Sequence, residues 1–87
     1  MNLSGRSFDP RAVDVTVDDD ELTVALADGR RVSAPLAWFP LLRNGNPAQR
    51  RNWRLIGDGQ GIHWPDLDED LSVGGLLLGI AAPGSSK

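Results

Sequence analysis

The chain has 87 residues, a formal net charge of −3 and no cysteine. A domain of this length buries only about 60 % of its unfolded surface, so its large apolar residues are needed for the core and little remains for a deep enzyme cleft. The lack of cysteine excludes disulfides, thiolate metal sites and cysteine nucleophiles, and the negative charge argues against nonspecific affinity for nucleic acid.

The two ends of the sequence differ from its middle. Residues 1–11 show no sustained period of 2 or 3.6, and we expect a flexible leader there. No apolar run approaches the roughly 20 residues of a membrane span, and residues 1–10 hold no hydrophobic core of a secretion signal. A cysteine-free chain suits a reducing compartment. We expect a soluble, cytoplasmic protein with one compact domain over residues 12–81 and a disordered tail over residues 82–87.

Alternating apolar residues predict two strands near the start of the domain. Residues 13–17 read Val-Asp-Val-Thr-Val and residues 22–26 read Leu-Thr-Val-Ala-Leu, the period of two that half-buried strands show. The acidic link between them, residues 18–21, sets a register in which all six apolar side chains share one face. The predicted pairs are Val17 with Leu22, Val15 with Val24 and Val13 with Leu26.

The next turn decides where a third strand pairs. A two-residue turn at Asp28-Gly29 would oppose apolar to polar side chains throughout. A three-residue loop with Gly29 left-handed, a type I turn followed by a bulge, removes most of this conflict and predicts a strand over residues 30–34. The predicted pairs are Val24 with Val32 and Leu22 with Ala34.

Two short helices are expected between the third strand and the centre of the chain. Residues 36–42 form a dense apolar run whose helix is limited by Pro40, which sits in the first turn or breaks the element in two. Asn46 is a helix N-cap, with Pro47 at the first helical position and Gln49 at the third.

Residues 53–65 hold two of the three tryptophans and the only histidine, and they predict a β-hairpin. Asp58 and Gly59 form the centre of a two-residue turn in which both residues need a positive φ. One face of the hairpin is then aromatic and aliphatic, and only Ile56 is out of place. The predicted pairs are Trp53 with Trp64, Leu55 with Ile62 and Arg54 with His63.

After the hairpin, Pro65 ends the strand, and residues 66–70 read as a polar link. A final helix over residues 73–80, capped by Asp70 or Ser72, has apolar residues at i, i+3, i+4 and i+7. The sequence therefore predicts an α+β fold with an antiparallel three-strand meander, one or two short helices, a β-hairpin and a C-terminal helix. Its predicted core includes Val15, Val24, Trp38, Trp53, Trp64 and Leu76.

No catalytic, metal or cofactor site is predicted. His63 has neither a cysteine nor a serine and aspartate at a recognisable spacing, so no nucleophilic triad is expected and the chain is predicted not to be an enzyme. The alternating aspartates of residues 66–70 resemble a calcium loop, but Leu71 and Leu77 stand where that loop needs glycine and glutamate. The glycines of residues 57–61 lack the Lys-Ser/Thr of a phosphate loop.

Charged surfaces offer the remaining candidates. A polar strip beside the tryptophan hairpin suits a small, basic protein partner, because charge complementarity sets specificity and association rate. The strip consists of Arg54, His63, Asp66, Asp68, Glu69 and Asp70. As an alternative, Arg50, Arg51 and Arg54 with Trp53 suit nucleic acid, unless these arginines only face the negative end of a helix. A small-ligand sensor is a third alternative and would require a pocket.

Four segments of the chain carry a family resemblance. They are Leu26-x-Asp28-Gly29-Arg30-x-Val32, Pro35-Leu36-x-Trp38-Phe39-Pro40, Gln49-Arg50-x-Asn52-Trp53, and the run from Gly61 to Val73 that reads Gly-Ile-His-Trp-Pro-x-Leu-Asp-Glu-Asp-Leu-Ser-Val. With them the chain resembles the small bacterial family called domain of unknown function 2442. The resemblance implies a compact α+β domain without agreed catalytic residues.

The resemblance also implies a context. Many members of that family are encoded beside domain of unknown function 4160, which implies a toxin–antitoxin-like pair with this acidic chain as the antitoxin-like member. Some members carry a helix-turn-helix that this chain lacks, and Gly74 stands where a helix-favouring residue is expected.

Overall fold

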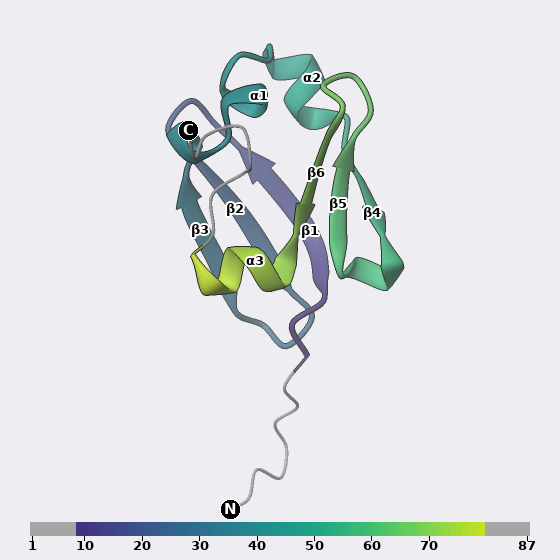
Figure 1. Ribbon diagram of the computed structural model, residues 1–87. Helices are drawn as coiled ribbons and strands as arrows, with labels where there is room; N and C mark the ends of the chain where they lie inside the picture. Colours follow the sequence, from purple (N-terminus) through teal and green to yellow (C-terminus); the bar gives the residue numbers. More distant parts are fainter. Residues whose placement is uncertain (1–8, 80–87) are drawn as a thin grey trace, which may run out of the picture.

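The structure, a computed structural model, describes residues 9–79 (Figure 1). Within this range the chain forms two antiparallel three-stranded sheets, which confirms the predicted α+β class. The first sheet contains β1 (Ala12–Val17), β2 (Glu21–Leu26) and β3 (Arg31–Pro35), and the second contains β4 (Arg54–Ile56), β5 (Gly61–Trp64) and β6 (Glu69–Ser72). The helices are α1 (Pro40–Arg43), α2 (Pro47–Arg51) and α3 (Val73–Leu78), with 3-10 turns η1 (Leu36–Trp38) and η2 (Gly57–Gly59).

The helices lie at opposite ends of the sheets, with α1 and α2 together at one end and α3 at the other (Figure 1). The expected tail and most of the expected leader, residues 1–8, lie outside the described residues.

The register of the first sheet is confirmed over most of its length. Its observed pairs include Val17 with Leu22, Val15 with Val24, Val24 with Val32 and Leu22 with Ala34. Gly29 has a φ of +96°, and the N–H of Leu26 donates to the carbonyl of Arg30 over 2.8 Å. The three-residue loop with a left-handed glycine is therefore present, as the parity of the strands required.

The predicted pairing of Val13 with Leu26 is wrong. A β-bulge between Ala12 and Asp14 brings Ala12 opposite Leu26, and it leaves the Val13 side chain 53 % exposed. The physical reason lies in the second hairpin, whose tip packs closely here: a Cβ on Gly59 would lie only 2.6 Å from the Ala12 carbonyl oxygen. The small alanine fits this crowded position, and the bulge turns the larger valine outward.

Both helix predictions for the middle of the chain are confirmed. The apolar run divides at Phe39 into η1 and α1, and Pro40 is the first residue of α1. Asn46 caps α2 with a reciprocal pair of hydrogen bonds: its Oδ1 accepts the Gln49 N–H over 2.8 Å, and Gln49 Oε1 accepts the Asn46 N–H over 2.9 Å. Two N–H groups at the start of this five-residue helix are thereby satisfied.

The central hairpin has the predicted register, with Arg54 opposite His63 and Leu55 opposite Ile62. Asp58 and Gly59 both have positive φ, at 57° and 92°. The Gln60 N–H donates to the Gly57 carbonyl over 3.1 Å across them. This geometry matches the turn that favours Asp-Gly.

The polar link predicted over residues 66–70 is only partly present, because residues 69–72 form β6 and pair with β5. Along this strand Glu69 and Leu71 are buried, while Asp70 and Ser72 are exposed. Three of its four residues are polar, and a glutamate occupies an inward position. The sequence therefore lacks the alternation of apolar and polar residues from which a half-buried strand is predicted. The hairpin is thus part of a three-stranded sheet.

The final helix is shorter than predicted. The Ser72 hydroxyl oxygen accepts the Gly75 N–H over 3.1 Å, which confirms Ser72 as the cap, and the left-handed Gly79 ends the helix at Leu78. Val73 and Leu76 are buried, whereas Leu77 is 41 % exposed. Ile80, the last residue of the predicted helix, lies outside the described residues.

One hydrophobic core joins the two sheets. Of the residues predicted to form it, Val15, Val24, Trp64 and Leu76 are buried, and Trp38 and Trp53 are partly buried against it. The indole N–H of Trp64 donates to the Arg50 carbonyl over 3.0 Å, so the largest core side chain has its polar group satisfied.

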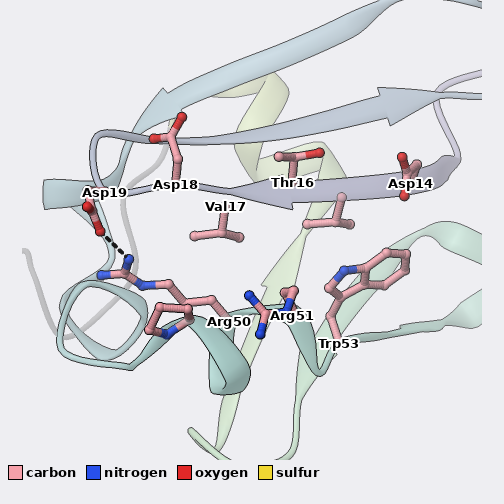
Figure 2. A pocket seen from close by; sticks show the side chains of 10 residues that line it. Asp14, Thr16, Val17, Asp18, Asp19, Arg50, Arg51 and Trp53 are labelled. Carbon is pink, nitrogen blue, oxygen red and sulfur yellow. Dashed lines mark hydrogen bonds and ion pairs between the residues drawn. The ribbon is translucent and has the colours of Figure 1, made fainter.

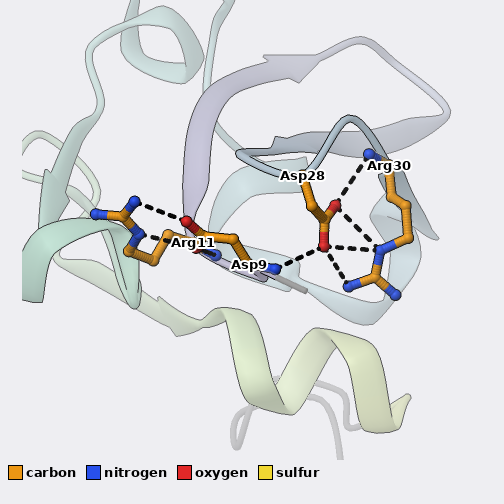
Figure 3. A network of polar contacts seen from close by, with 4 residues as sticks. All are labelled: Asp9, Arg11, Asp28 and Arg30. Atoms are coloured by element: carbon orange, nitrogen blue, oxygen red, sulfur yellow. Dashed lines mark hydrogen bonds and ion pairs between the residues drawn. The ribbon is translucent and has the colours of Figure 1, made fainter. Parts of the chain in front are cut away.

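A polar network holds the chain entering β1 against the loop between β2 and β3 (Figure 3). The Asp28 carboxylate accepts the Asp9 N–H over 3.0 Å and hydrogen bonds from the Arg30 guanidinium at 2.9 and 3.1 Å. Asp9 in turn binds the Arg11 guanidinium at 2.7 and 2.8 Å. The Asp28 side chain is only 5 % exposed, and the Arg30 hydrogen bond is the main reason that its pKa is lowered to about 2.

Candidate interaction surface

The second sheet carries a row of polar side chains, one from each strand. Arg54 of β4 lies opposite His63 of β5, and His63 lies opposite Asp70 of β6. Directly opposite residues on neighbouring antiparallel strands project from the same face. These three members of the predicted strip are therefore brought together on the face of the sheet that points away from the core.

His63 and Asp70 form the tightest contact of this row. His63 Nδ1 lies 2.5 Å from Asp70 Oδ1, and the two side chains are 29 % and 68 % exposed. Because Nδ1 faces the carboxylate, the tautomer of His63 that carries its proton on Nδ1 donates a hydrogen bond to Asp70. The contact orients the imidazole and leaves the aspartate open to solvent.

An apolar side chain lies beside the row. Ile56 follows Arg54 on the same face of β4, opposite Gly61, and is 42 % exposed. A Cβ at Gly61 would lie 2.9 Å from the Ile56 side chain, so the absence of a side chain there lets Ile56 lie across β5. A shallow hollow of about 400 Å³ adjoins both residues and Asp70. Polar and apolar contacts are thus available side by side.

Asp66 and Asp68 lie in the turn that joins β5 to β6, and both are exposed. Asp66 Oδ2 accepts a hydrogen bond from Asn52 Nδ2 over 3.0 Å, which ties the turn to the end of α2. Asp68 has a φ of 51°, a left-handed conformation that aspartate tolerates better than most residues. These two carboxylates extend the acidic end of the row that begins at Asp70.

Glu69 does not share this exposure. It projects inward from β6, is only 6 % exposed, and one of its oxygens, Oε1, accepts the Asp70 N–H over 2.9 Å. Among residues 9–79, Oε2 has no hydrogen-bond partner. Burial of the carboxylate raises the pKa of Glu69 above its ordinary value. The structure therefore places five of the six strip residues at the surface and Glu69 in the interior.

The three arginines of the alternative site have different surroundings. Arg50 is 8 % exposed, and its guanidinium donates to the carbonyls of Leu42 and Arg43 and to Asp19. Arg51 and Arg54 are exposed. Arg50 is thus committed to internal contacts, which leaves two of the three guanidinium groups for a phosphate.

Within residues 9–79, no three acidic, histidine or cysteine side chains are grouped closely enough to hold a metal ion. The same residues include no helix long and apolar enough to cross a membrane.

Comparison with known proteins places this geometry in a family of unknown function. The family model described as protein of unknown function (DUF2442) matches residues 12–82. A crystal structure of a protein of unknown function from Rhodospirillum rubrum is similar, with a TM-score of 0.74 and 29 % identity over 87 % of this chain and 94 % of that one.

A second similar structure is the solution NMR structure of an uncharacterized protein from Chromobacterium violaceum. It has a TM-score of 0.70 and 23 % identity over 83 % of this chain and 68 % of that one, a likeness that concerns the fold. No curated protein matches the sequence.

Proposed function

We propose that this chain, which belongs to the DUF2442 family, is a noncatalytic protein-interaction domain. The observation that carries the proposal is the exposed row of Arg54, His63 and Asp70 across the second sheet, beside the exposed Ile56. A short sheet holds these side chains at fixed spacing, so little conformational entropy is lost when a partner binds them. Apolar contact with a polar surround is the composition that protein interfaces use.

The contacts of His63 support the noncatalytic part of the proposal. A histidine oriented by an aspartate needs a nucleophile to complete a catalytic triad. Ser72 follows Asp70 on the same face of β6, but its hydroxyl oxygen accepts the Gly75 N–H as the cap of α3. In residues 9–79 no hydrogen bond joins it to His63. The pair of His63 and Asp70 therefore acts as a fixed polar contact.

The charges of the surface indicate the kind of partner. Asp66, Asp68 and Asp70 face solvent at one end of the row, against one exposed arginine, Arg54, at the other, in a chain of net charge −3. A small, basic protein complements such a surface and associates with it faster at low salt. The product of a neighbouring gene, in a toxin–antitoxin-like pair with this chain as the antitoxin-like member, is our proposed partner.

Co-expression with the product of the neighbouring gene, followed by size-exclusion chromatography, tests the proposal. We expect one shared peak at tens of micromolar, and separate elution contradicts the pair. In a shared complex, replacing Asp66, Asp68 and Asp70 by asparagine should weaken affinity about tenfold or more. Asp58→Asn removes one carboxylate from the hairpin tip and is the control for each of the three replacements made singly, since asparagine also tolerates the observed φ of 57° there.

A further inference from the structure

β1 is an edge strand of the first sheet, whose order is β1-β2-β3. The Asp18 N–H donates to the Glu21 carbonyl over 3.0 Å, so this pair is hydrogen-bonded across the turn. Hydrogen-bonded and non-hydrogen-bonded pairs alternate along an antiparallel ladder. Val17, opposite Leu22, and Val15, opposite Val24, are therefore non-hydrogen-bonded positions whose N–H and C=O groups point away from β2.

These edge groups are left unpaired in the part of the chain that the structure describes. No backbone hydrogen bond outside the sheet ladders reaches Val15 or Val17 among residues 9–79, and neither do the side-chain hydrogen bonds of those residues. An edge strand with free donors and acceptors is a template on which another strand can pair. Soluble domains use such edges to bind extended peptides.

A groove of about 560 Å³ runs along this edge (Figure 2). Residues 14–19 of β1 and the following turn line one side of it, and Pro47, Arg50, Arg51 and Trp53 line the other. The close approach of Gly59 to Ala12 marks one end of the free edge. The ion pair of Arg50 with Asp19, at 2.7 Å, marks the other.

The two faces of β1 give the groove a mixed character. Val17 points into the groove, and the Trp53 side chain on the opposite wall points toward β1, whereas Asp14, Thr16 and Asp18 point away from the groove (Figure 2). Val17 and Trp53 are only partly buried. An added strand would place every second side chain against this apolar wall and the intervening ones beside Asp14 and Asp18.

Charge decides between a second copy of the chain and a different partner. Antiparallel pairing of two β1 strands around Thr16 would set Asp14 of each copy near Asp18 of the other, and like charges on neighbouring strands repel. Arg50 is already neutralised by Asp19, so among the lining residues Arg51 is the remaining positive charge, against Asp14 and Asp18 on β1 and Asp20 and Glu21 at the turn. The surroundings of the edge thus favour a strand that carries lysine or arginine.

We propose that the free edge of β1 binds an extended, basic segment of a partner protein by strand addition. From Asp14 to Asp18 the edge accommodates about five residues, or about 16 Å of extended chain. Small apolar residues of the segment alternate with basic ones, the apolar ones against Val17 and Trp53 and the basic ones beside Asp14 and Asp18. This docking surface lies on a different sheet from the row of Arg54, His63 and Asp70 and does not depend on it.

The probe is a capped seven-residue peptide in which lysine and valine alternate, titrated into the full-length protein and followed by NMR. We expect the amide signals of Val15 and Val17 to shift on binding and their hydrogen exchange to slow. A peptide with glutamate in place of lysine should bind about tenfold more weakly. A peptide with the same side chains but N-methylated on alternate residues should lose binding, because it lacks the donors for a ladder.

Two protein variants complete the test. Asp14→Lys should weaken binding of the basic peptide about fivefold, and Arg31→Glu, on β3 at the opposite edge of the same sheet, should leave it unchanged. Val17→Pro removes an N–H that the sheet does not use, so the domain should still fold, as its dispersed NMR spectrum would show, and the peptide should not bind.

Three results would overturn strand addition by a basic segment. If the N-methylated peptide bound as tightly as the unmodified one, the binding would be explained by charge attraction without strand pairing. Unshifted Val15 and Val17 signals at millimolar peptide would show that the edge does not pair. Dimerisation of the protein alone, abolished by Val17→Pro, would assign the edge to a second copy of the chain.

Discussion

Arg50 Nη1 donates a hydrogen bond to Asp19 Oδ1 over 2.7 Å, although the two residues are 31 positions apart in the sequence. The same guanidinium donates to the carbonyls of Leu42 and Arg43 over 2.9 and 2.8 Å, where α1 ends. Backbone carbonyls at a helix C-terminus lack intrahelical partners, and a cation satisfies them. Arg50 therefore joins the β1–β2 turn, α1 and α2 at one end of the molecule.

We expect Arg50→Ala to lower the free energy of unfolding by about 3 kcal/mol, because it removes three hydrogen bonds from a charged group, including the one to the Arg43 carbonyl at the end of α1. Arg51→Ala, next to it on α2 and exposed, should change stability by no more than about 0.5 kcal/mol. Urea denaturation of the two variants measures the difference. Equal losses would show that the internal contacts of Arg50 do not stabilise the fold.

The sequence predicted this region only in part, for a definable reason. The N-cap of α2 by Asn46 follows from local chemistry, since both partners of the capping box lie within four residues. The partners of Arg50 lie 7, 8 and 31 positions away. Nothing in the local pattern around Arg50 indicates them, so an arginine of the proposed basic cluster proved to be an internal cross-link.

The second sheet shows the same limit. The pairing of Arg54 with His63 was predictable, because the Asp-Gly turn fixes the register of one hairpin. The pairing of His63 with Asp70 depends on β6, whose inward Glu69 interrupts the alternation of apolar and polar residues. The sequence therefore predicted a polar strip beside the hairpin. The alignment of Arg54, His63 and Asp70 across three strands could not be predicted without β6.

Asp28 should contribute to stability against acid. Its pKa is lowered to about 2, chiefly by the Arg30 hydrogen bond and further by the Asp9 N–H. A carboxyl whose pKa is lowered on folding stabilises the protein above its ordinary pKa, and this contribution is lost as the pH falls toward 2. We expect Asp28→Asn to lower the urea midpoint at pH 6 and to have almost no effect at pH 2.

Asp58→Asn removes a carboxylate from the other hairpin tip and is the control for a change of net charge. If Asp28→Asn lowers the urea midpoint equally at pH 6 and pH 2, the ionised carboxylate is not the source of the stability. Such a result would mean that Asp28 stabilises the fold through the shape and hydrogen bonds of its side chain, which asparagine does not reproduce, and not through its charge.

Glu69 should have the opposite pH dependence. Burial raises its pKa in the folded protein, so the folded state holds the proton more tightly than the unfolded state does. Protonated Glu69 therefore contributes to the free energy of unfolding in full below the ordinary carboxyl pKa. This contribution is lost as the pH rises through the raised pKa of the folded state. Glu69→Gln keeps the shape without the charge, and we expect it to raise the free energy of unfolding by about 1 kcal/mol at pH 7.

The gain should be absent at pH 4, where Glu69 is mainly protonated in the folded state. Urea denaturation at the two pH values measures it, with Asp68→Asn as the control for the exposed carboxylate next to Glu69, since asparagine also tolerates the φ of 51° there. A loss of stability in Glu69→Gln at pH 7 that exceeds the loss at pH 4 would indicate that the ionised carboxylate is stabilised where it lies.

Two glycines allow backbone strain to be separated from close packing. Gly29 and Gly59 have nearly equal φ values of +96° and +92°, a region in which a side chain is strained. Within the described part of the chain, a Cβ on Gly29 would meet nothing within 4 Å, whereas on Gly59 it would lie 2.6 Å from the Ala12 carbonyl oxygen. Since that neighbour is backbone, it cannot move aside as a flexible side chain does.

Gly29→Ala should therefore cost about 1 kcal/mol of unfolding free energy from strain alone, and Gly59→Ala about 3 kcal/mol, because it also pushes the hairpin tip away from β1. Urea denaturation gives both values, and the amide shift of Ala12 reports the displacement. Equal costs, with the Ala12 signal unmoved, would mean that the tip does not press on β1. The bulge that turns Val13 outward, and the closed end of the edge groove, would then need another cause.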